Sequence, residues 1–198
     1  MDVGRKGCDS VVSVFKVNPQ AQGAAIKSLV NIYTLTDDHF EHQALFVKKL
    51  FYKYKARAIV IDGNGLGIGL MDFMVKPQTD YDTGDVYPDF GVINDEENFY
   101  RKFRTDNTVL DAIYIIKASA PINTEAHANA QTQMSSGKVQ FLIDERVAKA
   151  KLMEMSKGKA MKPEERAEYL KPFTLTSILK EEMMNLREDH EGVNIILK

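Results

Sequence analysis

The chain has 198 residues, of which 44% are hydrophobic and 27% charged, the ordinary composition of a globular protein with a hydrophobic core. Its single cysteine, Cys8, excludes an internal disulfide and fits a reducing compartment. The formal net charge of −2 excludes binding to nucleic acid through overall basicity, although local basic clusters can still meet phosphates. No apolar run approaches the roughly 20 residues that span a bilayer, and residues 1–17 lack the pattern of an export signal.

The beginning of the chain predicts β-structure. Residues 1–4 have the pattern of a strand end and residues 11–17 that of a second strand. Turn-forming residues, including two glycines, lie between them and favour a hairpin. Residues 25–35 are rich in β-branched and aromatic side chains, which predicts a third strand. The simplest arrangement is an antiparallel meander of three strands.

A helix is expected next. Apolar residues recur at helical spacing over 40–54, and Thr36 or Asp37 is available as the N-cap. Residues 58–61 then form a short apolar run, typical of a strand that is covered on both faces. The glycine-rich residues 63–65 lead into a second helix, from about residue 66 to 75. This alternation of strands and helices predicts an α/β fold with a parallel portion.

The second half of the chain is less regular at first. Residues 77–107 contain many Asp, Tyr and Gly residues without a sustained period, which indicates an insertion or a mobile loop. Further expected elements are a strand over 110–117, a helix opened by Pro121 over 123–135 and ended by Gly137, a strand over 139–143, helix with a flexible centre over 145–171, a helix over 174–188 and a strand over 193–198. The chain ends abruptly within this last strand. We therefore expect an excised fragment, with a single domain over 1–198.

Two aspartates end predicted strands. A carboxylate such as that of Asp2 is unfavourable within a strand and costly to bury without a partner, although Asp2 alone also fits a turn. Asp62 ends the most hydrophobic short run of the chain, and ligands of parallel sheets gather at the carboxyl ends of strands. If the two strands are neighbours, the carboxylates repel each other unless a divalent cation lies between them. Oxygen ligands suit Mg²⁺ or Mn²⁺, so we predict a metal site at Asp2 and Asp62.

The residues around these aspartates suggest contacts with DNA. The glycines after Asp62 do not have the spacing of a dinucleotide-binding loop, and we predict instead that Gly63 and Gly65 let a DNA backbone come close. Arg5 and Lys6, in the first turn of the chain, are predicted to hold phosphates. Two local basic clusters either meet phosphates or are solvated helix faces, namely Lys48, Lys49, Lys53, Lys55 and Arg57, and Arg101, Lys102 and Arg104.

Several motifs together resemble the nuclease domain of phage terminase large subunits. They occur in order along nearly the whole chain, and each is weak alone, but their order and spacing make a reasonably specific set. The motifs are DVGRKGCDSV at 2–11, IVIDGNGLG at 59–67, NTEAHANAQTQMSSG at 123–137, KVQF at 138–141 and EMMNLR at 182–187.

This resemblance implies a ribonuclease H-like fold, in which a mixed sheet of an antiparallel meander plus parallel strands is flanked by helices. It also implies an endonuclease that cuts concatemeric double-stranded DNA with two Mg²⁺ or Mn²⁺ ions in the cytoplasm of an infected bacterial host. Asp2 and Asp62 match the first and second metal carboxylates of the family. The implied partners are double-stranded DNA, the terminase ATPase domain, the small terminase subunit and the capsid portal.

One family feature is missing from the sequence. The third metal carboxylate of the family lies on a helix after the last hairpin, near a Lys-Asp pair, and the chain stops at Lys198 before such a helix. The fragment is therefore expected to bind metal weakly and to cut DNA poorly. By analogy alone, the remaining candidates for a third ligand are Asp144, Asp189 and Glu191.

The sequence is also compatible with three alternative hypotheses about the function of the chain. The chain could be another ribonuclease H-like nuclease, such as a junction resolvase or a transposase. A sugar-kinase or actin-like nucleotide binder also opens with a hairpin that carries Asp-x-Gly, but it needs a second phosphate-binding hairpin that the sequence does not contain. The third reading is a non-catalytic module that docks on the capsid portal through residues 77–107.

Overall fold

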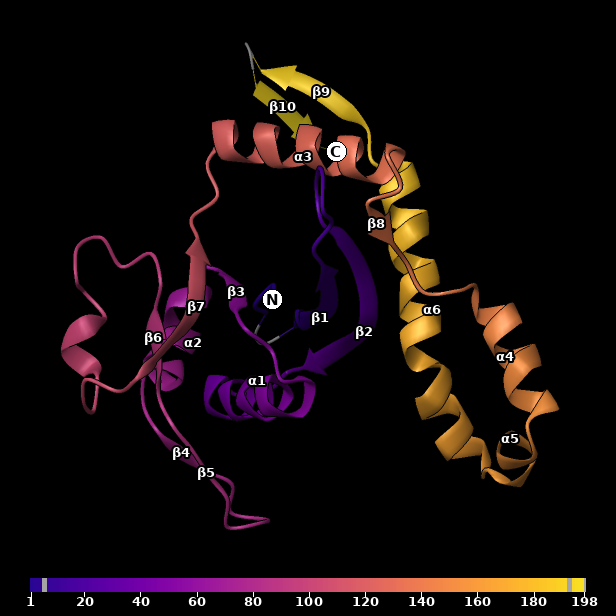
Figure 1. Ribbon diagram of the computed structural model, residues 1–198, viewed down its shortest axis with the longest axis horizontal. Helices are drawn as coiled ribbons and strands as arrows, with labels where there is room; N and C mark the ends of the chain where they lie inside the picture. Colours follow the sequence, from indigo (N-terminus) through magenta and orange to yellow (C-terminus); the bar gives the residue numbers. More distant parts are fainter. Residues whose placement is uncertain (5–6, 192–193, 198) are drawn as a thin grey trace. The chain divides into compact units, whose positions relative to one another are not determined.

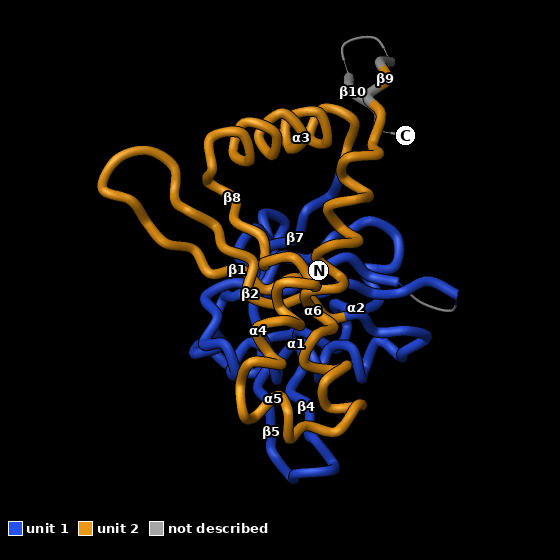
Figure 2. Tube along the Cα trace, turned by 90° about the vertical axis from the view of Figure 1, so that its right-hand side faces the viewer, with its two compact units in different colours: residues 1–12, 34–118 blue, residues 13–33, 119–198 orange. Residues whose placement is uncertain are grey.

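The computed structural model describes residues 1–4, 7–191 and 194–197. The chain divides into two units of dense internal packing, coloured separately in Figure 2. Unit 1 consists of residues 1–12 and 34–118, and unit 2 of residues 13–33 and 119–198. The expectation of a single domain over 1–198 stays a prediction.

A parallel sheet lies in unit 1. It consists of β3 (Ile59–Asp62), β7 (Leu110–Ile116) and β6 (Phe90–Val92), hydrogen-bonded in that order (Figure 1). Both neighbouring pairs are parallel, and Asp62 lies opposite Ile116 in the register. The strands predicted over 58–61 and 110–117 are confirmed.

The first residues of the chain extend this sheet. The amino nitrogen of Met1 donates to the Val60 carbonyl (2.6 Å), and the Asp62 N–H donates to the Met1 carbonyl (3.1 Å), which is the hydrogen-bond pattern of parallel strands. On the other side, Asp2 pairs antiparallel with Val11 through two hydrogen bonds of 3.0 Å. The segment Met1–Asp2 is thus hydrogen-bonded on both sides.

Val11 belongs to β1 (Asp9–Asn18), which is hydrogen-bonded to β2 (Ile26–Thr36). Within unit 1, the hydrogen-bonded order is therefore residues 9–12 of β1, Met1–Asp2, β3, β7 and β6. The structure is mixed α/β, with antiparallel as well as parallel strand pairs. The predicted hairpin near the start of the chain is present as the pairing of Asp2 with Val11.

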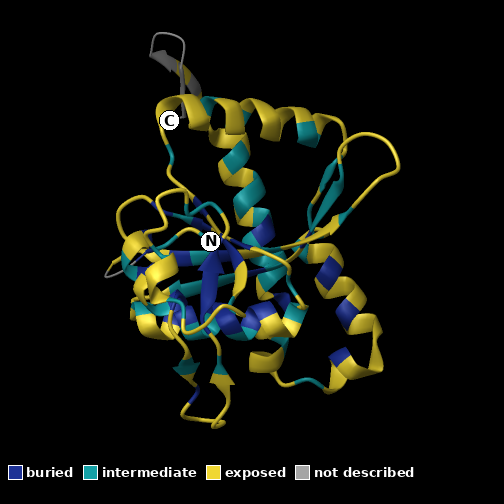
Figure 3. Cartoon of the chain, turned by 60° about the vertical axis from the view of Figure 1, so that its left-hand side comes forward, coloured by how far each residue is buried: buried dark blue, intermediate teal, exposed yellow. Residues whose placement is uncertain are grey.

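Two helices supply the rest of the core of unit 1. They are α1 (Phe40–Tyr54) and α2 (Gly67–Met74), and they pack against each other. The ring of Phe51 lies 4.7 Å from that of Phe90, so α1 also meets the buried face of the sheet. Figure 3 shows the buried residues in dark blue; in unit 1 they include Ala44, Val47, Leu50, Phe51, Ile59, Ile61, Leu70, Met71, Met74, Phe90, Val92, Ala112 and Ile113.

Strand β3 was predicted to be buried on both faces of the sheet, but only one of its faces is buried. Ile59 and Ile61 are buried, but Val60 is 46% exposed. Side chains alternate between the two faces of a strand, so only the face of Ile59 and Ile61 is covered. The opposite face carries Val60 and, two residues later, Asp62.

The predicted N-cap of the first helix is wrong. The N-cap of α1 is His39, and its side chain makes no capping hydrogen bond. Asp37 has a left-handed backbone (φ 51°), and its carboxylate accepts a hydrogen bond from the Gly7 N–H (2.6 Å). Asp37 therefore binds the turn after the first strand instead of the helix.

Residues 77–107 contain regular structure. They include β6, a short hairpin of β4 (Gln78–Thr79) and β5 (Val86–Tyr87), and the 3₁₀ helix η1 (Arg101–Phe103). The sequence did not indicate β6 because three residues are too few to show a period. Two of those three residues, Phe90 and Val92, are in the core, so the segment contributes to the fold. Its status as an insertion stays a prediction.

Unit 2 is mainly helical. Its helices are α3 (Ala120–Ser135), α4 (Glu145–Glu154), α5 (Ser156–Ala160) and α6 (Pro163–Asn185). A short strand, β8 (Val139–Gln140), pairs parallel with β2, and β9 (Glu188–Glu191) pairs antiparallel with β10 (Asn194–Leu197). Pro121 lies in the first turn of α3, as predicted, and β8 is shorter than the expected strand over 139–143.

The last long helix was predicted to begin near residue 174, but α6 begins at Pro163 and continues through Pro172. Proline lacks the N–H that closes a helical hydrogen bond and usually ends a helix. Packing offsets that cost here, because Leu170 is buried against Ala148 and Leu152 of α4. In the described part of the chain, no helix is long and apolar enough to cross a membrane.

The first basic cluster was predicted to meet phosphates or to be a solvated helix face, and for Lys48 both predictions are wrong. Its side chain is fully buried, and its ammonium donates to the carbonyls of Phe73 (3.2 Å) and Lys76 at the end of α2. Burial lowers the pKa of Lys48 to about 8, although Asp89 acts in the opposite direction. Lys48 therefore joins α1 to the C-terminal end of α2 and is not available to phosphates.

The buried ammonium predicts a pH dependence of stability. Below pH 8 Lys48 is charged in both the folded and the unfolded state, so the full cost of burying the charge remains. Between the folded pKa of about 8 and the ordinary value of 10.5, only the unfolded state keeps the proton, so the free energy of unfolding rises with pH. Relative to Lys48→Met, we expect a rise on the order of 2–3 kcal/mol from pH 7 to pH 10.5, measured by urea denaturation.

The exposed residue Lys16 supplies the control. Lys16→Met removes the same charge without removing a buried ammonium, so its difference from the unsubstituted protein is expected to stay flat over this pH range. A flat difference for Lys48→Met as well would mean that the Lys48 pKa is not lowered by folding.

Candidate metal site

The two predicted metal carboxylates belong to neighbouring backbone segments. The hydrogen bonds of Met1 to Val60 and Asp62 place Met1 opposite Ile61, and therefore Asp2 opposite Asp62. Neighbouring strands lie about 4.8 Å apart, and residues opposite each other project from the same face of a sheet. Asp2 and Asp62 are thus adjacent on one face, although they are 60 positions apart in the sequence.

The surroundings of the pair are open on one side. Asp62 is half-buried, and its Oδ1 accepts a hydrogen bond from the Asn64 N–H (2.9 Å), while Asp2 is exposed. Burial lowers the pKa of the Met1 amino group, whereas the charges of Asp2 and Asp62 both act to raise it. Both carboxylates therefore lie close enough to the Met1 amino group to interact with its charge.

The glycines after Asp62 have clear packing roles. A Cβ on Gly63 would lie 2.2 Å from Cγ2 of Ile115, and one on Gly67 would lie 1.8 Å from the Asp62 carbonyl oxygen. Gly65 has a left-handed backbone (φ 56°) with open space beside it. The loop packs so closely against β7 that only glycine fits at position 63. The predicted contacts of Gly63 and Gly65 with DNA stay predictions.

At this edge of the sheet, the side chains of two asparagines form hydrogen bonds with the backbone of neighbouring segments. The Asn64 side chain donates to the Ala118 carbonyl (3.1 Å), just beyond β7. Asn94 forms two hydrogen bonds with the backbone of Ile115, accepting from its N–H (3.0 Å) and donating to its carbonyl (2.7 Å). They hold the segments after β3 and β6 against β7, and no local sequence signal indicated either residue.

A buried polar network holds the segment that carries Asp2. The Ser10 hydroxyl lies 2.8 Å from the Gly4 N–H, which donates to it, and 2.7 Å from Oε1 of Gln43. The Gln43 amide nitrogen donates to the carbonyls of Gly4 (3.1 Å) and Asp38 (2.8 Å). Gln43 and Ser10 are fully buried. The network fastens the first turn of the chain to the beginning of α1, and sequence reasoning missed it.

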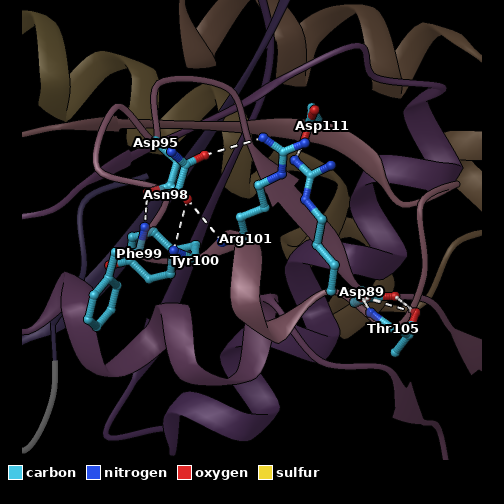
Figure 4. Close-up of polar contacts among 9 residues, drawn as sticks. Asp89, Asp95, Asn98, Phe99, Tyr100, Arg101, Thr105 and Asp111 are labelled. Carbon is cyan, nitrogen blue, oxygen red and sulfur yellow. Dashed lines mark hydrogen bonds and ion pairs between the residues drawn. The ribbon is translucent and has the colours of Figure 1, made fainter.

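The loop after β6 leaves the sheet at the same edge. The Asp95 carboxylate accepts hydrogen bonds from the backbone N–H groups of Phe99, Tyr100 and Arg101, as Figure 4 shows. In the second predicted basic cluster, the guanidinium of Arg104 pairs with Asp111, and the ammonium of Lys102 lies 4.2 Å from the centre of the Phe99 ring. Part of that cluster is therefore engaged within the protein.

The other predicted site residues lie in unit 2 or outside the described residues. Arg5 and Lys6 lie outside the described residues. Asp144 caps α4 in unit 2, where the Arg146 backbone N–H holds the pKa of Asp144 below its usual value. Asp189 and Glu191 lie on β9, also in unit 2. No group of three or more His, Cys, Asp or Glu side chains suited to a metal ion occurs among the residues that the structure describes.

The donors present nevertheless fit a hard divalent cation. Both are carboxylates, which supply the oxygen ligands that Mg²⁺ and Mn²⁺ prefer. They project from one face, and Asp62 is held in place by its hydrogen bond to Asn64. A pair of protein carboxylates leaves the remaining coordination positions to water and substrate oxygens, as is usual for Mg²⁺.

Comparison with protein-family models, with curated proteins and with solved structures finds no match for this chain. The resemblance to terminase nuclease domains therefore rests on the sequence motifs. The placement of Asp2 beside Asp62 is an independent observation about the same residues.

Proposed function

We propose that this chain is a ribonuclease H-like nuclease domain of the kind found in phage terminase large subunits, with Asp2 and Asp62 as metal ligands. The observation that carries the proposal is their adjacency on neighbouring parallel backbone segments. The mixed sheet supports it, because antiparallel pairing of Asp2 with Val11 is joined to the parallel strands β3 and β7, as the resemblance implies.

Asp2 and Asp62 have a defined task in such a reaction. Bound Mg²⁺ or Mn²⁺, two ions by the resemblance, would supply the Lewis acidity that activates water and stabilises the leaving 3′ oxygen. The hydrogen bond from Asn64 to Oδ1 of Asp62 fixes the orientation of that carboxylate before metal arrives. Asp2, which is exposed, faces the side from which DNA would approach. Two adjacent carboxylates repel a phosphate, so binding of DNA here requires the cation.

The biological setting is also part of the proposal. The substrate would be concatemeric double-stranded DNA in the cytoplasm of an infected bacterium. The terminase ATPase domain, the small terminase subunit and the capsid portal would be partners. Cleavage is expected to show little sequence preference, since the sequence contains no pattern typical of a base-reading helix.

A direct test combines metal binding with cleavage. We expect Mn²⁺ to bind in a calorimetric titration, and supercoiled plasmid to be nicked in the presence of Mn²⁺ but not with excess EDTA. A chain that neither binds Mn²⁺ nor nicks the plasmid would contradict the proposal. Preferential cleavage of branched DNA over linear DNA would instead favour a resolvase.

A further inference from the structure

A second feature of the chain is a strong concentration of positive charge in unit 2. Residues 146–162 contain six basic residues and one acidic residue, Glu154, and so carry a net charge of +5. The rest of the chain has 20 basic and 27 acidic residues, a net charge of −7. We call this the α4–α5 basic surface; its cations are Arg146, Lys149, Lys151, Lys157, Lys159 and Lys162.

The cations of this surface are available to a partner. All six residues are exposed. Arg146 lies 3.4 Å from Asp144, but 93% of its side chain remains exposed. Among the residues that the structure describes, no acidic side chain pairs with Lys149, Lys151, Lys157 or Lys159. The positive charge is therefore not neutralised within the described chain.

An ordered scaffold holds these lysines. Ala148 and Leu152 of α4 are buried against Leu170 of α6, with Met161 and Phe173 packed around them. A Cβ on Gly158 would lie 1.9 Å from the Leu152 carbonyl oxygen, so α5 approaches the end of α4 closely. Figure 1 shows α4 and α6 side by side, with α5 at the turn between them. The apolar side of α4 faces this core, and its lysines face outward.

We propose that the α4–α5 basic surface binds the phosphate backbone of duplex DNA. Lysine ammonium groups act as point charges towards phosphates and release counterions when they bind. Five of the six cations are lysines, and residues 146–162 contain no Asn, Gln, Tyr or Trp with which to read bases or stack on them. The contact is therefore electrostatic and independent of sequence. The choice of DNA among polyanions rests on the proposed function, but the surface does not involve Asp2 or Asp62.

The test measures DNA binding without metal. Fluorescence anisotropy with a duplex of about 20 base pairs, in EDTA and over a range of KCl concentrations, gives the affinity and its salt dependence. The test variant replaces Lys149, Lys151, Lys157 and Lys159 with Gln. The control variant replaces the exposed residues Lys16, Lys76, Lys171 and Arg187 with Gln, which makes the same change in net charge.

The two variants are expected to differ clearly. Each lost phosphate contact lowers the slope of log K against log salt by about 0.9, so the test variant should lose roughly 2–4 in slope and at least about tenfold in affinity near 0.1 M KCl. The control should stay within about twofold of the unsubstituted chain. Circular dichroism checks that both variants are folded.

Three outcomes would overturn the inference. One is equal DNA binding by the test variant and the unsubstituted chain. Another is equal weakening in both variants, which would mean that only net charge matters. The third concerns phosphatidylcholine vesicles that contain about one third phosphatidylserine. If the test variant binds DNA normally but no longer binds these vesicles, the surface is a membrane-binding surface. Because EDTA removes metal, failure of the proposed nuclease activity cannot imitate any of these results.

Discussion

Replacement of Asp62 with Asn is expected to lower the rate of Mn²⁺-dependent plasmid nicking by about 10³-fold or more, equivalent to roughly 4 kcal/mol of transition-state stabilisation. Asn keeps the size of the side chain and an oxygen that can accept the hydrogen bond from Asn64. It loses the negative charge that attracts the cation. Single-turnover nicking at saturating Mn²⁺ measures the chemical step, and a parallel calorimetric titration measures the loss of metal affinity.

The adjacency of the two carboxylates also predicts how an Asp2 variant and a double variant should behave. If Asp2 and Asp62 hold the same ion, Asp2→Asn should cause a similar loss, and the double variant should be little worse than either single one. Asp82→Asn, on the exposed β4–β5 turn, is the matched control and is expected to keep full activity. Undiminished nicking by either single variant would remove that residue from the mechanism. Additive losses would mean that the two carboxylates act on separate events.

Replacement of Gln43 with Ala is expected to destabilise the fold by about 3 kcal/mol. The Gln43 side chain is fully buried and contacts Ser10, Gly4 and Asp38 through hydrogen bonds. Its removal leaves buried polar groups of Ser10 and Gly4 without this partner and opens a cavity. Urea denaturation, followed by circular dichroism, measures the free energy of unfolding.

Gln22→Ala provides the control, because Gln22 is exposed and its loss is expected to cost less than about 0.5 kcal/mol. The same network holds the segment that carries Asp2. Gln43→Ala should therefore also weaken Mn²⁺ binding under conditions where the variant remains folded. A variant as stable as the unsubstituted chain would show that the network does not contribute to the fold. Normal stability with weakened Mn²⁺ binding would confine its effect to the position of Asp2.

Elements with a strong local pattern were predictable. The apolar run ending at Asp62, the helical spacing over 40–54 and the apolar strand over 110–117 correspond to β3, α1 and β7. Elements whose stability comes from packing were not. Strand β6 is too short to show a period, and α6 continues through Pro172 although local chemistry predicts a break there.

The basic surface shows a similar division. The charge of residues 146–162 is a property of the sequence, but a run of lysines alone does not show which side chains face solvent. The burial of Ala148 and Leu152 against α6 decided that. Lys48 is the opposite case, because it lies in a basic run yet is buried under the end of α2.

By itself, the sequence determined that carboxylates follow two strand-like segments, and that glycines surround the second of them. Only the tertiary structure decided that these carboxylates are neighbours, because strand order and register depend on hydrogen bonds between residues about sixty positions apart. Local residue patterns do not predict which distant segments will pair. The buried contacts of Gln43 with Gly4 and Ser10 arise in the same way, since they require α1 to have packed against the first turn.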